Sequence, residues 1–128
     1  MTARVLDIGN CVPDHTALTT MIRQNFGVDV VQAHGRDDAC EQLAKGDISL
    51  ILINRILDRD GSDGLEILKE LKADENYASI PAMLITNFPE HQQAAVAAGA
   101  VEGFGKLALH EPNTVAKLRP YLTSGECP

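Results

Sequence analysis

The chain has 128 residues, 45% of them hydrophobic and 23% charged, which fits one globular domain that buries its core without disulfides or metals. Its net charge of -7 disfavours a surface for nucleic acid or for an anionic membrane, because both need clustered Lys and Arg. The three cysteines are far apart and fit reduced thiols, and the first residues lack the long apolar stretch of a signal peptide. We therefore expect a cytoplasmic protein whose partners are other proteins.

Short apolar runs alternate with segments of helical periodicity along the chain. The runs predict five strands, the last of them weak, at residues 5–8, 28–31, 48–54, 82–86 and 101–104. The segments between and after the runs predict five helices, which open near Pro13, Arg36, Asp63, Pro89 and Pro112. Five such alternations predict an α/β fold, a doubly wound five-stranded parallel sheet with helices on both faces.

Two features of the helices concern where they end. Gly27 supplies a stop for the first helix. The last helix extends to about Leu122 and contains Pro120, which lacks an amide hydrogen and should bend or shorten the helix. We expect residues 1–122 to form one domain and residues 123–128 to form a flexible tail.

The predicted strand Ile48–Asn54 is an unbroken apolar run without polar alternation. Such a run suits the central strand of a parallel sheet, which is covered on both faces. Asn54 then lies at the carboxyl end of the strand, the edge where open α/β sheets assemble their sites. An amide, and not an acid, stands at this position.

Four segments resemble, in their order and spacing, the receiver domains of two-component response regulators, or CheY-like domains. They are the strand that ends at Asn54, the helix opening Asp63–Glu66, and the segments Ile80–Thr86 and Gly99–Lys106. The resemblance covers the chain from Arg4 to about Leu122. It implies a non-enzymatic signalling module of a two-component or phosphorelay system, which contacts a histidine kinase or an output protein.

The resemblance also assigns site positions. The family has an acidic pair after the first strand, a phosphoaccepting aspartate after the third, a Ser or Thr after the fourth and a lysine after the fifth. These positions fall on Gly9 and Asn10, Asn54, Thr86 and Lys106. Magnesium needs carboxylate oxygens, and an acyl phosphate needs a carboxylate nucleophile. We therefore expect no metal or other cofactor, and no phosphorylation on aspartate.

The switch of the family is also altered. Gly103 stands where the family usually carries an aromatic residue, and Leu107 replaces the proline that commonly follows the lysine. The resemblance therefore implies that the coupled movement of Thr86 and an aromatic side chain does not operate in this chain. Dimerisation through the surface of the fourth helix, the fifth strand and the fifth helix, which the family often uses, stays open.

Asn54 and Lys106 each allow more than one interpretation. Asn54 either mimics one signalling state, through hydrogen bonds to Thr86 or Lys106, or reflects drift after phosphorylation was lost. Lys106 needs a partner if it is partly buried, and we expect that partner to be Asp7 or Asp58. Such a pair is structural and not catalytic.

We favour a receiver-like interaction module over two alternatives. One is a phosphoaccepting response regulator that uses a displaced carboxylate, Asp58, Asp60 or Asp7. The other is a small-ligand or metal site at the same edge. A calcium loop beginning at Asp58 lacks the glycine needed at its sixth position, which is Asp63, and the glutamate needed at its twelfth, which is Lys69.

Overall fold

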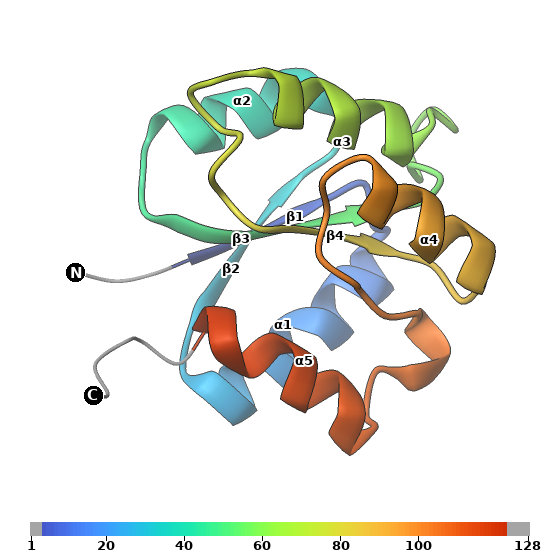
Figure 1. The fold of residues 1–128 in the computed structure, drawn as a ribbon. Coiled ribbons are helices and arrows are strands. Elements are labelled where there is room, and N and C mark those ends of the chain that lie inside the picture. Colours follow the sequence, from blue (N-terminus) through green and yellow to red (C-terminus); the bar gives the residue numbers. More distant parts are fainter. Residues whose placement is uncertain (1–3, 123–128) are drawn as a thin grey trace.

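The computed structural model describes residues 4–122, and within them one parallel sheet of four strands forms the centre of the molecule (Figure 1). The strands are β1 (Arg4–Ile8), β2 (Asp29–Ala33), β3 (Ile48–Asn54) and β4 (Ala82–Ile85). Their order in the sheet is β2-β1-β3-β4. β3 is hydrogen-bonded to β1 on one side and to β4 on the other, as its apolar run predicts. The predicted tail, residues 123–128, lies outside the described residues.

Helices cover both faces of the sheet, so the predicted doubly wound architecture is confirmed. They are α1 (Val12–Phe26), α2 (Arg36–Ala44), α3 (Gly64–Ala73), α4 (Pro89–Ala97) and α5 (Pro112–Leu122), with the short 3-10 helix η1 (Lys106–Ala108) between the last two. α1 and α5 pack on one face, and α2, α3 and α4 on the other (Figure 1). Between residues 4 and 122, no helix is long and apolar enough to cross a membrane.

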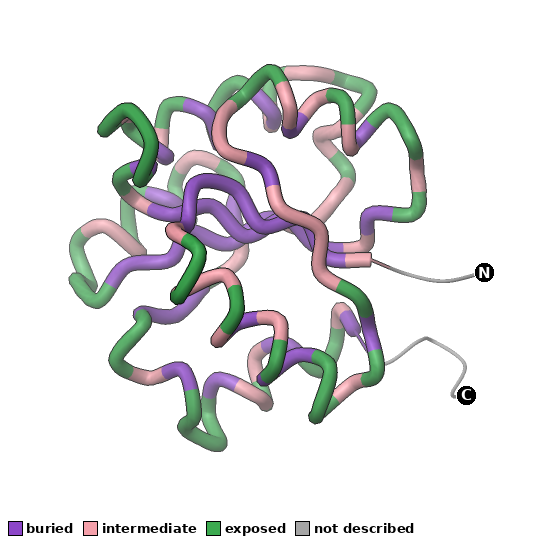
Figure 2. The backbone as a smooth tube through the Cα atoms, turned by 180° about the vertical axis from the view of Figure 1, so that it is seen from behind, coloured by how far each residue is buried: buried purple, intermediate pink, exposed green. Residues whose placement is uncertain are grey.

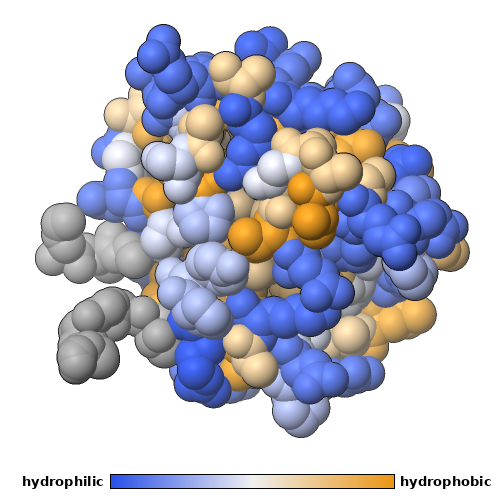
Figure 3. Space-filling model, viewed as in Figure 1, coloured by the Kyte–Doolittle hydropathy of each residue, from blue (hydrophilic) through white to orange (hydrophobic). Residues whose placement is uncertain are grey.

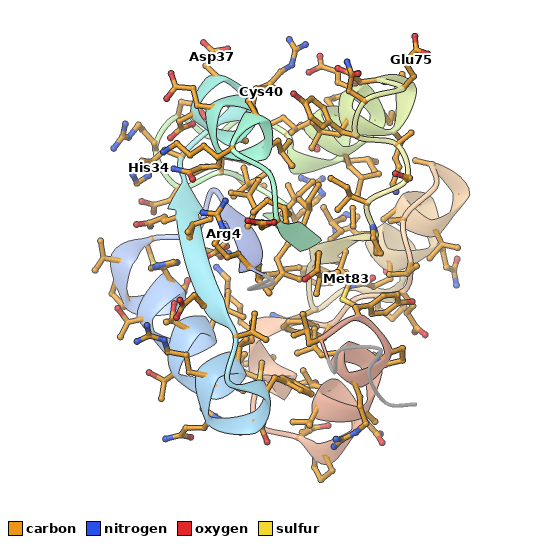
Figure 4. The ribbon with its side chains drawn as sticks, turned by 90° about the vertical axis from the view of Figure 1, so that its left-hand side faces the viewer. Arg4, His34, Asp37, Cys40, Glu75 and Met83 are labelled. Atoms are coloured by element: carbon orange, nitrogen blue, oxygen red, sulfur yellow. The ribbon has the colours of Figure 1, made fainter. Side chains whose placement is uncertain are left out.

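The strands divide the core into two apolar layers. Along β1, Leu6 and Ile8 pack toward α2 and α3, whereas Val5 packs toward α1 and α5. Figure 2 shows the buried strands in the middle, with mostly exposed helices and loops around them. In Figure 4, Met83 lies among the strands, while Asp37 and Glu75 point outward to solvent. The face seen in Figure 3 is largely hydrophilic, with a smaller hydrophobic area near its middle.

The helix ends follow the sequence signals closely, with one exception. Gly27 caps α1 in the left-handed conformation, with φ 67°. The Asp63 side chain caps α3 by accepting a hydrogen bond of 3.0 Å from the backbone N–H of Leu65. α5 spans Pro112–Leu122, as predicted, and it continues through Pro120, which therefore does not shorten it.

The predicted fifth strand is wrong as well. In the described chain it forms a single parallel bridge, between Phe104 and Ile85. Beside that bridge the side-chain amide of Gln92 joins the two backbones. Its Nε2 donates to the carbonyl oxygen of Leu84 at 2.9 Å, and its Oε1 accepts from the N–H of Gly103 at 2.9 Å. A side chain from α4 thus takes over hydrogen bonds that a strand ladder would make through its backbone.

Removing this amide should cost stability. We expect Gln92→Ala to lower the free energy of unfolding by about 1–3 kcal/mol. The Gly103 N–H and the Leu84 carbonyl oxygen would each lose a hydrogen bond to the Gln92 amide. Urea denaturation measures the change. Gln93→Ala is the matched control, since Gln93 is an exposed neighbour on the same helix. Equal stability of the two variants would contradict a structural role for the Gln92 amide.

Candidate functional site

The assigned site positions follow the strands at the carboxyl edge of the sheet. Gly9 and Asn10 follow β1, Asn54 ends β3, Thr86 follows β4, and Lys106 opens η1. Since parallel strands end at one edge, the fold brings these positions to a common rim. The hydrogen bonds and ion pairs at this rim nevertheless differ from those expected from the sequence. The functional roles of its residues stay predictions.

Asn54 is buried, and its side-chain amide is used as a hydrogen-bond donor. Its Nδ2 donates to the carbonyl oxygen of Gly9 at 3.1 Å, which ties the end of β3 to the end of β1. The same carbonyl accepts a second bond of 2.8 Å, from the backbone N–H of Asp58. One interpretation of Asn54 involved bonds to Thr86 or Lys106; within residues 4–122 its amide instead bonds to the end of the first strand.

Asp7 is a fully buried carboxyl group on the face of β1 that packs against α1. One oxygen accepts from Asn10 Nδ2 at 2.5 Å, and the other lies 2.8 Å from His15 Nδ1. Burial raises the pKa of Asp7, and the bonds to Asn10 and His15 together with the charges of His15 and Lys106 partly offset the rise. The sequence interpretation missed His15, because a histidine in the first turn of a helix resembles many surface histidines.

Lys106 is bonded to Asp14, in the first turn of α1. The Nζ–Oδ2 distance is 2.7 Å, and this bond is the main reason why the pKa of Asp14 lies below its usual value. Cys11 Sγ donates to the same carboxylate at 3.2 Å. Among the described residues neither predicted partner, Asp7 or Asp58, is bonded to Lys106, so that expectation is corrected. Asp7 still experiences the charge of Lys106, whereas the Asp58 residue is exposed.

Leu57, in the loop between β3 and α3, is buried against the end of β1. Its side chain is 1% exposed and lies directly against Gly9, where a β-carbon would come within 2.5 Å of Leu57 Cγ. Gly9 itself has φ 85°, a conformation that side chains rarely adopt. The loop is held by two backbone bonds of 2.9 Å, from Leu57 N–H to Ser62 and from Gly61 N–H to Leu57. Asp60, on the outer side, is exposed.

At the rim, the carboxyl end of β4 faces the start of α4. Thr86 Oγ1 lies 3.3 Å from His91 Nδ1 and accepts a bond of 3.3 Å from the Phe88 N–H. At Gly103 a β-carbon would lie 2.4 Å from the Leu84 carbonyl oxygen, so no side chain fits there. A groove of about 870 Å³ runs beside these residues, between α4 and α5.

The donor atoms at the rim do not fit a magnesium ion. Gly9 has no side chain, and Asn54 turns its amide hydrogens toward a carbonyl oxygen. Asn10 Oδ1 is buried and has no hydrogen-bond partner within the described residues, but it is a neutral oxygen. Between residues 4 and 122 there is no group of three or more His, Cys, Asp or Glu side chains placed to hold a metal. Magnesium is held by carboxylates and water, which this set does not supply.

Comparison with known proteins defines the fold. No protein-family model matches the sequence, and no curated protein matches it. Among solved structures, the signal receiver domain of a DNA-binding response regulator from Colwellia psychrerythraea is 21% identical with a TM-score of 0.77, over 92% of this chain and 96% of that one. A putative response regulator from Chloroflexus aurantiacus is 19% identical with a TM-score of 0.80, over 95% and 98%.

The chemotaxis protein CheY4 of Vibrio cholerae is similar to the same extent. It is 19% identical with a TM-score of 0.73, over 95% of this chain and 99% of that one. At identities this low the likeness concerns the fold. The chain has the fold of response regulator receiver domains, with four strands in its sheet between residues 4 and 122 instead of the expected five.

The raised pKa of Asp7 leads to a prediction for stability. The folded state holds this proton more tightly than the unfolded state, so the wild-type protein should lose stability as pH rises from about 4 toward the raised pKa. Asp7→Asn removes that loss. We expect the stability of the variant relative to wild type to increase between about pH 4 and about pH 5.5, below the range where histidine titrates.

Denaturant titrations at several pH values measure this difference. Asp14→Asn is the control, for which the change of stability with pH should have the opposite sign. The pKa of Asp14 is lowered in the folded state, so the ionised carboxylate stabilises the wild-type protein fully above the pKa of the unfolded chain. Relative to wild type, this variant should become less stable as pH rises through the range below about 4. A constant difference for Asp7→Asn across the range would show that Asp7 ionises freely in the folded protein.

Proposed function

We propose that this chain is a receiver-like signalling module that acts through protein contacts and is not controlled by phosphorylation on aspartate. The observation that carries the proposal is the bond from Asn54 Nδ2 to the Gly9 carbonyl oxygen. The side chain at the position of the phosphoacceptor is an amide donor, and it is engaged in holding two strand ends together. The receiver fold of the chain supports the signalling class.

The chemistry of the rim supports the loss of phosphoryl transfer. A carboxylate oxygen is the nucleophile in acyl phosphate formation, and an amide nitrogen offers no comparable lone pair. Phosphoryl transfer also depends on positive charge that balances the transferred group. Here the Lys106 ammonium is already paired with Asp14 at 2.7 Å.

The proposed partners are a histidine kinase or an output protein or domain, in the cytoplasm. The net charge of -7 supports protein partners over direct contact with nucleic acid or membrane. A homodimer is compatible with the same surface chemistry. The groove between α4 and α5 has three exposed hydrophobic residues on its border, Phe88 at 56%, Val96 at 47% and Leu107 at 86% exposure, and such residues are common at protein interfaces.

Incubation with acetyl phosphate and magnesium, followed by intact-mass measurement, tests the proposal. We expect the mass to stay unchanged, while a receiver that carries the three acids gains one phosphoryl group under the same conditions. A stoichiometric adduct that is labile to hydroxylamine, as an acyl phosphate is, would overturn the proposal.

The alternative, phosphorylation on a displaced carboxylate, has less support. Asp7 is fully buried with both oxygens engaged. Asp58 and Asp60 are exposed residues on the outer side of the loop. The Asp60 carboxylate is occupied by bonds from the Ser62 hydroxyl and N–H, which lower its pKa. If an adduct forms, Asp→Ala changes at these three positions identify the acceptor.

A further inference from the structure

We infer that the carboxyl edge of the sheet is a docking surface for a protein segment that carries apolar side chains flanked by lysine or arginine. This inference rests on the proposed function, and it names the surface and the partner chemistry through which the chain would act. Four exposed hydrophobic residues surround the rim at this edge. They are Val12, Ile56, Phe88 and Leu107, and together they are called the apolar ring below.

Exposed hydrophobic side chains are concentrated at this edge. Five large hydrophobic residues are exposed in the part of the chain that the structure describes, and four of them form the apolar ring, each more than half exposed. The fifth, Val96, lies on α4. Single exposed hydrophobic residues are normal on a protein surface, whereas a group of them marks an interaction site.

Two hydrogen bonds join the loops on the β4 side of the apolar ring. Leu107 donates its N–H to Asn87 Oδ1 at 3.1 Å, so the start of η1 lies against the loop between β4 and α4. Arg55, the residue before Ile56, donates its N–H to the carbonyl oxygen of Ile85 at 3.2 Å. The loop between β3 and α3 therefore lies beside the end of β4.

Two further contacts close the ring on the β1 side. Asp58 donates its N–H to the carbonyl oxygen of Gly9 at 2.8 Å, which joins the loop after β3 to the loop after β1. Lys106 is bonded to Asp14 at 2.7 Å, which joins η1 to the first turn of α1, where Val12 stands. The members of the apolar ring thus surround one continuous area of the surface.

The polar residues inside the ring are withdrawn from solvent. Asn10, Asn54 and Thr86 are all buried, with exposures between 1% and 9%. A reaction site needs such groups to be accessible to its substrate. At this edge the accessible side chains are hydrophobic ones, which suit burial against another protein, because the centre of a protein interface is depleted in charge and enriched in apolar side chains.

Exposed carboxylates beside the apolar ring indicate the charge of the partner. Asp58, Glu90 and Glu111 each follow a member of the ring by two to four positions, and all three are exposed. Between residues 4 and 122, none of these three takes part in an ion pair. The cations Arg55 and Lys106 are, in contrast, already paired with carboxylates.

The partner should therefore be basic as well as apolar. Arg59 is the remaining exposed cation in the loop after β3, and the exposed Asp60 next to it offsets its charge. Apolar anchors supply most of the binding free energy at an interface, and complementary charges select the partner. The net charge of -7 acts in the same direction, because it attracts a basic segment and repels an anionic membrane.

Two synthetic peptides serve as probes of this surface. One consists of leucine, serine and lysine, and the other has glutamate in place of every lysine. Each is titrated into the isotope-labelled chain while the amide NMR signals are followed. We expect the lysine peptide to shift the signals of Val12, Ile56 and Leu107 until they saturate, and the shifts to shrink as salt is added. The glutamate peptide should leave these signals in place.

Substitutions separate the apolar ring from the groove between α4 and α5. Ile56→Ser should weaken binding of the lysine peptide at least about fivefold, because an apolar contact is lost. Val96→Ser is the matched control, since Val96 is exposed in the groove and outside the ring, and it should change the affinity less than about twofold. All substituted side chains are exposed, and the amide spectrum confirms that each variant is folded.

A second pair of variants tests the charge of the surface. Asp58→Asn should weaken binding of the lysine peptide about twofold to fivefold, because a carboxylate beside the ring is lost. Glu75→Gln is the control with the same change of net charge, and it should leave the affinity unchanged, since Glu75 is exposed in the loop between α3 and β4, away from the rim.

Four results would overturn the docking surface. They are an absence of saturable shifts at the ring, equal affinity for the two peptides, and equal weakening by Ile56→Ser and Val96→Ser. The fourth is binding to vesicles of phosphatidylserine that Ile56→Ser abolishes, which would make the edge a membrane contact. Labelling of wild type by acetyl phosphate, in contrast, would overturn the proposed function, so the two failures are distinguishable.

Discussion

Asn54→Asp is expected to destabilise the protein by about 2–3 kcal/mol at pH 7, and not to restore phosphorylation. The reason is the bond from Asn54 Nδ2 to the Gly9 carbonyl oxygen at 3.1 Å. Aspartate replaces the donor with an acceptor, so a negatively charged oxygen faces a carbonyl oxygen at a buried position. Asn54 therefore contributes a bond that the acid cannot make.

Urea denaturation at pH 7 measures this loss, and Asn76→Asp is the matched control, because Asn76 lies on an exposed turn. The control should change stability by less than about 0.5 kcal/mol. The destabilisation should shrink at low pH, where the introduced carboxyl group becomes protonated and neutral. If Asn54→Asp were as stable as Asn76→Asp at pH 7, the side-chain amide of Asn54 would not stabilise the folded protein.

Leu57→Ala is expected to cost about 3 kcal/mol of unfolding free energy. The side chain is 1% exposed and packs in the core layer under α2 and α3, so its truncation leaves a cavity. Leu57→Met keeps most of the volume and should cost less than about 1.5 kcal/mol.

Leu107→Ala is the surface control for this experiment. Leu107 is 86% exposed and follows Lys106, so its truncation should change stability by less than about 0.5 kcal/mol. The denaturant midpoints of the three variants compare their stabilities, with the slope of the unfolding free energy against denaturant concentration held at one value. If Leu57→Ala and Leu107→Ala were equally stable, Leu57 would not be packed in the core as described.

Signals that act over a few residues predicted most of the fold. The apolar run of Ile48–Asn54 predicted a central strand, and the structure pairs it on both sides. Gly27 and Asp63 predicted helix ends through their own backbone and side-chain chemistry. These predictions hold because turns, caps and periodicity depend on neighbours in sequence.

The prediction of a fifth strand was wrong because the hydrogen bonding of this segment depends on a side chain that is distant in the sequence. The apolar residues before Lys106 fit a strand, but the Gln92 amide from α4 takes the hydrogen bonds of Leu84 and Gly103. Gln92 stands in an alanine-rich helix, and nothing in its neighbourhood reveals that it points at the sheet. α5 nevertheless continues through Pro120 to Leu122.

The positions of the site were predictable, whereas its pairings were not. Strand ends in a parallel sheet fall at one edge, which placed Asn54 beside the end of β1. The pairs Asp7–His15 and Asp14–Lys106 depend on how α1 lies against β1 and η1, which is a property of packing. The sequence analysis named Asp7 as a candidate partner of Lys106 but missed its actual partners, Asn10 and His15.

The contact between Gly9 and Leu57 limits which side chains can be accommodated at either position. A larger side chain at position 9 collides with Leu57, and a smaller one at position 57 opens a void beside Gly9. An acidic side chain at position 9 would therefore require at least a pair of coordinated substitutions, and each single substitution would make the protein less stable. Natural variation at either position should consequently appear together with variation at the other.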